Sequence, residues 1–204
     1  MTDDDGPGPG RADARRNRDA VLAAAVRVLS ERPDASMREV AEASGVGRTT
    51  VYRHFPARDD LVRALFRRVF DEAQEIAERH VAAGRAAWAG GEDADALEVV
   101  VGLTVAFAEL GERYRFLGVH RELEHEQLDA LTAEHGTEPL GSYLADAQAR
   151  GELRDDLTVP WMLDVVHGLT MTAAQHVRQG GATVAALRPM LAATVRGALG
   201  PPTG

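Results

Sequence analysis

The chain has 204 residues, of which 45% are hydrophobic and none is cysteine, so disulfides, thiolate metal sites and cysteine nucleophiles are excluded. No apolar run approaches about 18 residues, and the N-terminus is acidic where a signal peptide needs a basic and then an apolar region. We therefore expect a cytoplasmic protein with a hydrophobic core of its own and no membrane span.

The formal net charge of −9 is distributed unevenly along the chain. Residues 11–68 contain thirteen arginines and eight acidic residues, whereas residues 69–204 contain ten arginines and twenty-one acidic residues. A basic N-terminal third joined to an acidic remainder is typical of a protein that meets nucleic acid at one end only. Because the chain has no lysine at all, the choice of arginine at any single position carries little information.

The N-terminal segment begins with a polar tail and continues into a helix. Residues 1–10 are mainly Asp, Gly and Pro, which bury almost nothing, and we expect them to be disordered. Residues 17–32 have an apolar stripe at helical spacing that ends before Pro33, so they are predicted to form an amphipathic helix. The stripe consists of Val21, Ala25, Val28 and Leu29.

A short second helix is predicted from its capping signals. Ser36-Met37-Arg38-Glu39 fits a capping box, in which the Ser36 hydroxyl accepts from the Glu39 amide and the Glu39 carboxylate reaches back. Gly45 supplies the left-handed residue with which a helix ends in a tight turn.

A third helix is predicted over residues 47–55, closed by Pro56. Val51 and Phe55 lie four residues apart and are expected to face the core. Two short helices joined by a glycine-containing turn form the outline of a helix-turn-helix, whose second helix lies in the major groove of DNA.

The remaining side chains of this third helix are predicted to form one exposed polar face. Hydroxyls and the phenol donate to phosphate oxygens, guanidinium groups pair with phosphate or read guanine, and threonine methyls contact thymine methyls. The residues on this face are Arg48, Thr49, Thr50, Tyr52, Arg53 and His54.

The run SMREVAEASGVGRTTVYRHFPARDDLVRALF resembles the N-terminal region of TetR-type (tetracycline-repressor-like) transcriptional regulators. The resemblance spans about fifty residues, from roughly 17 to 70, and keeps a fixed spacing. The matching positions are Gly45-Val46, Thr50, Tyr52, His54-Phe55-Pro56 and Arg58-Asp59-Asp60-Leu61. The chain departs from the family pattern at Gly47, where Ser, Asn or Ala is common, so this helix start has no side-chain cap.

The resemblance implies an all-α protein of about nine helices, with a helix-turn-helix head at 11–57 and an effector-binding and dimerising body at 58–200. It implies a regulator, by default a repressor, that binds a pseudo-palindromic operator as a dimer and is released by a small-molecule effector. No enzymatic activity, cofactor or metal is implied.

The resemblance also assigns residues to DNA. Thr50, Tyr52, His54 and Arg58 are implied as mainly phosphate contacts, and Arg48 and Thr49 as base readers. Ser36 and Arg53 complete the set, although capping alone would explain Ser36. The arm formed by Arg11, Arg15, Arg16 and Arg18 is interpreted equally well as a further DNA contact or as a solvated basic run.

Further helices are predicted in the rest of the chain from apolar stripes, and no segment shows the period of a strand. A loop is expected at 84–95, although Trp88 within it needs a packing partner. The predicted helices are 58–83, 97–110, 120–134, 140–149, 161–178 and 183–199.

An effector pocket in the body is predicted from aromatic, methionine and histidine residues, because ligand pockets are mostly apolar with few polar groups. The alternative for each residue is ordinary core packing. The candidates are Phe107, His120, His125, Tyr143, Trp161, Met162, His167 and Met171.

A homodimer is predicted through the last two helices, at about 160–178 and 183–199. The first has small residues at Gly168, Ala173 and Ala174, and the second has an apolar stripe. Paired across a two-fold axis they would form a four-helix bundle. The alternative is that both surfaces are buried within the monomer. The stripe consists of Val184, Leu187, Leu191 and Val195.

Two short motifs indicate an enzyme as the alternative to a regulator. Glu122-x-x-His125 and Asp164-x-x-His167 resemble the E-x-x-H pairs of di-iron carboxylate bundles. The second pair has Asp in place of Glu, and the further inward glutamates that such a site needs are not evident. With 32 acidic residues and seven histidines, chance pairs are expected, so the regulator is the favoured interpretation.

Overall fold

The computed structural model describes residues 9–91, 95–120 and 139–201, and every regular element within these ranges is helical. The predicted all-α fold is therefore confirmed. None of the described helices is long and apolar enough to cross a membrane. The chain separates into two compact units, residues 1–68 with 116–127 and residues 69–115 with 128–204. The division between the units lies within one helix, Arg58–Gly90. The sequence analysis placed the boundary between the DNA-binding head and the body earlier, after residue 57.

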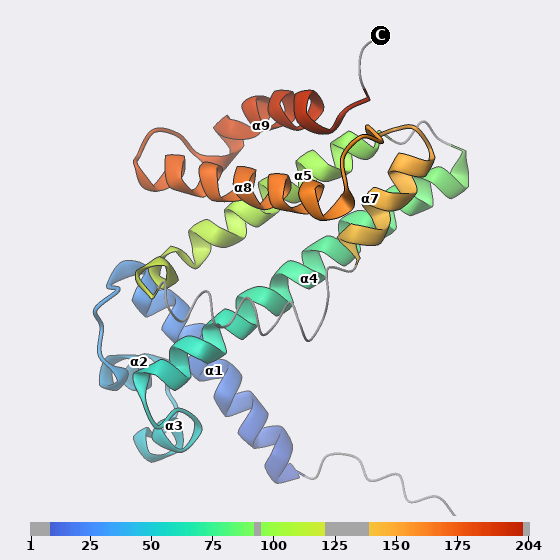
Figure 1. Ribbon diagram of the computed structural model, residues 1–204. Coiled ribbons are helices and arrows are strands. Elements are labelled where there is room, and N and C mark those ends of the chain that lie inside the picture. The colour runs from blue at the N-terminus through green and yellow to red at the C-terminus, as the bar shows by residue number, and fades with distance from the viewer. Residues whose placement is uncertain (1–8, 92–94, 121–138, 202–204) are drawn as a thin grey trace, which may run out of the picture. The chain divides into compact units, whose positions relative to one another are not determined.

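The first unit contains α1 (Pro9–Glu31), α2 (Met37–Ser44), α3 (Arg48–His54) and the start of α4 (Arg58–Gly90) (Figure 1). Both α2 and α3 pack against α1 and against each other. Apolar side chains from all four helices make a shared core, and the largest fully buried ones include Leu29, Phe55, Leu61 and Leu65. This core fixes which side of α3 faces outward.

The first helix begins earlier than the sequence predicted. It starts at Pro9 rather than Asn17, so the expected disorder of 1–10 is wrong for Pro9 and Gly10. Proline is favoured at the first helical position because its fixed φ suits the helix and its missing amide has no partner there. An ion pair between Asp13 and Arg16 lies on the added turns. Residues 1–8 lie outside the described part of the chain.

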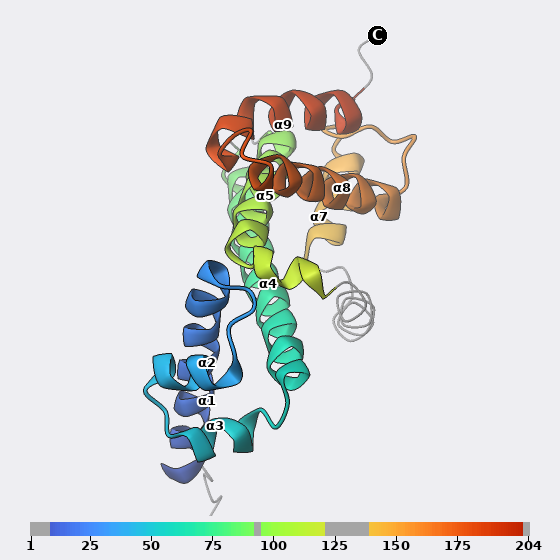
Figure 2. The same cartoon turned by 90° about the vertical axis from the view of Figure 1, so that its left-hand side faces the viewer.

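The second unit contains the rest of α4 with α5 (Ala96–Arg113), α7 (Leu140–Ala149), α8 (Val159–Arg178) and α9 (Val184–Leu199). A short 3-10 helix, η1 (Arg115–Val119), follows α5. Helices α8 and α9 lie side by side and both pack on α5, as the two views agree (Figure 2). The helix predicted at 120–134 lies outside the described residues except for His120.

Helix α4 continues to Gly90, so the loop predicted from residue 84 onward is wrong over 84–90. The reason is tertiary packing. Trp88 stacks on Tyr143 with ring centroids 4.6 Å apart, and its indole nitrogen donates to Glu152 over 3.1 Å. Gly84 is tolerated within the helix because Tyr143 packs directly over it. A Cβ at this position would lie 2.6 Å from the Tyr143 hydroxyl oxygen.

The apolar stripe of α9 is buried within the monomer, which is the alternative that the sequence left open. Its four side chains are between 0% and 7% exposed. Three of them form a cluster with Ala108 of α5 and Ala173 of α8. The stripe is therefore part of the monomer core.

Candidate nucleic-acid interface and ligand cavity

Helix α2 starts at the predicted capping box. Ser36 is the N-cap, its hydroxyl accepts from the Glu39 amide over 3.3 Å, and the Ser36 amide donates to the Glu39 carboxylate over 2.7 Å. The Ser36 hydroxyl also donates to that carboxylate over 2.8 Å. Although Ser36 is exposed, its hydroxyl is already engaged in fixing the helix start.

The Glu39 carboxylate accepts hydrogen bonds from Ser36 and from Arg32. Arg32, which directly follows α1, donates to its other oxygen over 2.6 Å. The pKa of Glu39 is lowered to about 2, first by the hydrogen bond from the Ser36 amide, then by the Ser36 hydroxyl and Arg32. An ionised carboxylate in the first turn of a helix also interacts favourably with the helix dipole. The start of α2 is thus held in one orientation.

The turn between α2 and α3 depends on a left-handed glycine. Gly45 has φ +69°, a conformation that residues with a Cβ rarely adopt, and its amide donates to the Glu42 carbonyl. The Ser44 hydroxyl accepts from the Val46 amide over 3.1 Å, which closes the turn. Gly47 caps α3 without any side-chain hydrogen bond, as its departure from the family pattern predicted.

The two faces of α3 are confirmed. Val51 is completely buried and Phe55 is 2% exposed. The opposite face presents Arg48, Thr49 and Arg53 as exposed side chains, and Thr50 and His54 are partly exposed. Tyr52 is 37% exposed, which is high for an aromatic ring. The polar groups therefore share one outward surface, and their contacts with DNA stay a prediction.

Arg48 and His54, two polar residues of this helix, each lie close to an aromatic ring. The Arg48 guanidinium lies 5.7 Å from the centroid of the Tyr52 ring, a cation–π distance that limits how both side chains move. The ring centroids of His54 and Phe55 are 6.3 Å apart. The Nε2 atom of His54 is buried and has no hydrogen-bond partner among the described residues.

Arg58, and Arg16 and Arg18 of the N-terminal arm, make contacts within the protein that the sequence did not indicate. The Arg58 guanidinium donates to the carbonyl oxygens of Ala35 and Pro33 over 2.5 and 2.7 Å. Arg16 pairs with Asp13, and Arg18 lies 5.7 Å from the centroid of the Phe55 ring. Arg15 is exposed, and the Arg11 side chain lies outside the described part.

A cavity of about 290 Å³ lies in the second unit, between α4, α5, α7 and α8. This is at the small end of the range for ligand pockets. Three of the eight predicted pocket residues line it, namely Phe107, His167 and Met171. The other described lining residues are Val69, Ala73, Leu110, Gly111, Leu140, Leu163, Val166 and Thr170.

The described walls of this cavity are almost entirely apolar. Thr170 is 5% exposed and its hydroxyl donates to the Val166 carbonyl over 2.9 Å, so its hydrogen is already used. His167 is exposed, and its imidazole is the one titratable side chain among the described lining residues. The arrangement suits an apolar molecule with a single polar contact at the His167 side.

The other predicted pocket residues lie elsewhere. Met162 and Tyr143 are completely buried in the core, and Trp161 is 57% exposed. Burial, reinforced by the nearby Glu152 carboxylate, raises the pKa of Tyr143 to about 12. His120 is grouped with the first unit, and His125 lies outside the described residues.

Sequence reasoning missed most of the cavity wall because its residues are ordinary aliphatic ones. Leu163, Val166 and Thr170 repeat at helical spacing on α8, which is a signal for burial rather than for a cavity. Leu140 at the start of α7 and Ala73 on α4 carry no distinguishing signal. The cavity exists because four helices fail to fill the space between them, and periodicity in one helix does not encode that.

The residues of the enzyme hypothesis are only partly described. Asp164 and His167 are both exposed on α8, and Glu122 and His125 fall outside the described part. Within the part of the chain that the structure describes, no three His, Asp or Glu side chains come together as a metal site would require.

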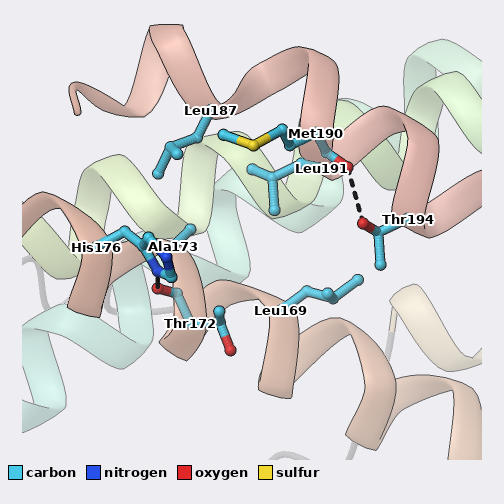
Figure 3. Close-up of a pocket in the computed structure, with 8 residues that line it drawn as sticks. All are labelled: Leu169, Thr172, Ala173, His176, Leu187, Met190, Leu191 and Thr194. Carbon is cyan, nitrogen blue, oxygen red and sulfur yellow. Dashed lines mark hydrogen bonds between the residues drawn. The ribbon is translucent and has the colours of Figure 1, made fainter. Parts of the chain in front are cut away.

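A second, smaller apolar groove of about 140 Å³ lies between α8 and α9 (Figure 3). Met190 is 58% exposed at this groove, where Leu187 and Leu191 also lie (Figure 3). The His176 ring donates to the Thr172 carbonyl over 3.1 Å, and the Thr194 hydroxyl donates to the Met190 carbonyl over 2.8 Å. The remaining lining residues are Leu169 and Ala173.

A helix-turn-helix with an outward polar recognition face, followed by a helical unit that encloses an apolar cavity, defines a class of helical DNA-binding regulators. Residues 21–65 match the family model for bacterial regulatory proteins of the tetR family. This match lies within the first unit and does not extend into the second.

One curated relative matches part of the chain. The HTH-type transcriptional repressor LfrR from Mycolicibacterium smegmatis is 48% identical over 64 residues, which cover 31% of this chain and 34% of that protein. The match thus spans about a third of the length of this curated relative.

Solved structures extend the likeness to most of the chain as a likeness of fold. LfrR from Mycobacterium smegmatis in complex with proflavine has a TM-score of 0.65 at 24% identity, over 89% of this chain and 94% of that one. FadR from Bacillus subtilis in complex with stearoyl-CoA has a TM-score of 0.62 at 19% identity, over 87% and 96%.

Proposed function

We propose that the protein is a ligand-responsive transcriptional regulator that represses genes by binding an operator and leaves the operator when a small molecule binds its second unit. The observation that carries the proposal is the outward polar face of α3, held by the buried side chains of Val51 and Phe55. Such a regulator would act in the cytoplasm, where bacterial DNA lies. Its role would require no catalytic residue.

The division of charge supports DNA binding by the first unit. The basic segment 11–68 attracts the phosphate backbone in a salt-dependent way, and the acidic remainder disfavours contact of other surfaces with DNA. Arg48 and Thr49 open α3, the end that enters the major groove in helix-turn-helix proteins. Tyr52 and His54 are the phosphate contacts that we propose.

Substitutions on α3 are expected to separate base reading from phosphate contact. Arg48→Ala is expected to cost about 1–3 kcal/mol on the preferred sequence and to relax the preference at one base pair. Tyr52→Phe combined with His54→Ala is expected to weaken binding to all sequences alike, by about 0.5–1.5 kcal/mol for each lost hydrogen bond. Gel-shift titration at fixed salt, on a duplex selected from a random library, measures both effects.

Arg79→Ala is the matched control for these variants, because Arg79 is an exposed arginine of α4 in the second unit. It removes one positive charge without touching the first unit and is expected to bind as the wild type does. If the α3 variants behave like this control, α3 is not the recognition helix.

The cavity of the second unit supports a small apolar effector. Its lining is aliphatic and aromatic, and His167 is the residue that would make a polar contact. The relatives with solved complexes hold proflavine in one case and stearoyl-CoA in the other. To release DNA, the effector must bind the released conformation more tightly than the DNA-bound one, by several kcal/mol for nearly complete switching.

A homodimer through α8 and α9 is the assembly that we propose. The groove between these helices exposes Met190 beside an apolar floor, and a second copy related by a two-fold axis would cover it. Two recognition helices would then meet successive major grooves about 34–36 Å apart on a pseudo-palindromic operator.

Met190→Glu is expected to dissociate this dimer. Met190 is 58% exposed, so the substitution costs the monomer little, but across a two-fold axis it brings two carboxylates into a desolvated contact. Sedimentation at micromolar concentration is expected to give a wild-type dimer and a monomeric variant. Ala82→Glu, which adds the same charge at an exposed position of α4, is expected to remain dimeric. A wild-type monomer under these conditions would contradict the proposal.

A further inference from the structure

Arg58 joins the start of α4 to the segment that leads into α2. Its Nη1 atom donates to the Ala35 carbonyl over 2.5 Å and its Nη2 atom donates to the Pro33 carbonyl over 2.7 Å. Ala35 is 2% exposed and immediately precedes Ser36, the N-cap of α2. One planar group therefore spans two carbonyl oxygens on either side of Asp34.

The two carbonyl oxygens stabilise the positive charge of Arg58 at the start of α4. A cation in the first turn of a helix interacts unfavourably with the helix dipole, and carbonyl oxygens compensate for this. Pro33 has no amide hydrogen, and the Ala35 amide donates to Arg32 over 3.0 Å. The two bonds from Arg58 add to this backbone bond and tie the loop to the first turn of α4.

Two arginines therefore hold the start of α2. Arg32, which directly follows α1, binds the Glu39 carboxylate of the capping box, and Arg58 of α4 binds the two carbonyls before Ser36. The guanidinium group suits the second role because its donors form a rigid fork, which an ammonium group does not have.

We propose that Arg58 is a positioning residue, which fixes α2, and through it α3, relative to the first turn of α4, rather than a phosphate contact. The proposal rests on DNA binding by α3, as proposed above. It assigns to Arg58 a role different from the one that the family resemblance implied. Loss of Arg58 would misplace the recognition helix without removing a charge from the DNA contact.

The salt dependence of DNA binding distinguishes the two roles. A side chain that neutralises a phosphate releases counterions, and its removal lowers the slope of log K against log salt concentration by about 0.9. A positioning residue changes the affinity at every salt concentration and leaves the slope as it was. A lysine would preserve a phosphate contact but not a fork across two carbonyls.

The experiment compares Arg58→Ala and Arg58→Lys with the wild type on the duplex that the wild-type protein selects from a random library. Fluorescence anisotropy gives Kd over a series of salt concentrations, and Arg53→Ala serves as the comparator that removes a DNA-facing charge. Both Arg58 variants are expected to raise Kd about tenfold at an unchanged slope, and Arg53→Ala is expected to lower the slope by about 0.9.

Hydrogen exchange without DNA supplies the independent measurement. The amides of Met37 to Glu39 are expected to exchange faster in Arg58→Ala than in the wild type. A lowered slope for Arg58→Ala with full recovery in Arg58→Lys would overturn the proposal, as would unchanged exchange and affinity. If the wild type selects no duplex, the proposed function fails, and the exchange experiment still decides whether Arg58 orders the start of α2.

Discussion

Phe55→Ala is expected to abolish DNA binding by unfolding the first unit rather than by removing a contact. The ring is 2% exposed and is among the largest fully buried side chains of the molecule. Truncating a buried phenylalanine to alanine costs about 3–5 kcal/mol, because both the transfer free energy and the surrounding contacts are lost. That is a large part of the stability of a small domain, since whole domains are stable by only about 5–15 kcal/mol. Urea titration followed by circular dichroism measures the loss.

Tyr52→Ala is the matched control for Phe55→Ala on the same helix. Tyr52 is 37% exposed, so the free energy of unfolding is expected to change by no more than about 0.5 kcal/mol. DNA affinity is nevertheless expected to fall, because the phenol lies on the outward face. A comparable loss of stability in both variants would mean that the outward and inward faces of α3 are wrongly assigned.

The boundaries of α2 and α3 were predictable because the sequence specifies local structure at each of them. Ser36 and Glu39 form the capping box that their spacing indicates, and Gly45 takes the left-handed conformation that ends α2. The four-residue spacing of Val51 and Phe55 was enough to orient α3. Each of these signals acts within one helical turn, so no knowledge of tertiary structure was needed.

Long-range packing explains where the predictions failed. A loop was expected from residue 84 because glycine is a poor helix former, but the contacts of Trp88 with Tyr143 and Glu152 come from distant segments and keep α4 helical to Gly90. The two carbonyls that hold Arg58 are separated from it by more than twenty residues. No local pattern indicates such a contact.

The apolar stripe of α9 shows a second limit of sequence reasoning. A stripe predicts that one face of a helix is buried, but the same stripe serves a monomer core or a partner interface equally well. Here Leu187 and Leu191 meet α5 and α8 within the chain. The exposed Met190, which belongs to no such stripe, is the better indicator of a surface that a partner would cover.

Filling the cavity of the second unit is expected to yield a regulator that binds DNA but no longer responds to its effector. Ala73 lines the cavity from α4, and a phenylalanine at this position would occupy much of the 290 Å³ space. Drug-sized ligands gain about 0.3 kcal/mol per non-hydrogen atom, so excluding roughly ten atoms costs about 3 kcal/mol, or on the order of 100-fold in affinity. Operator affinity is expected to stay at the wild-type value, since the first unit is unaltered.

Thermal-shift measurements with a panel of small apolar molecules, including proflavine and stearoyl-CoA, test this expectation. Compounds that raise the melting temperature of the wild type are expected to have no effect on Ala73→Phe. They are expected to act fully on Ala86→Phe, which places the same ring at an exposed position of the same helix. Ligand binding that survives in Ala73→Phe would place the effector site elsewhere in the second unit. Because ligand binding lowers the free energy of the state that it fits, the same compounds are expected to weaken operator binding by the wild type and not by Ala73→Phe.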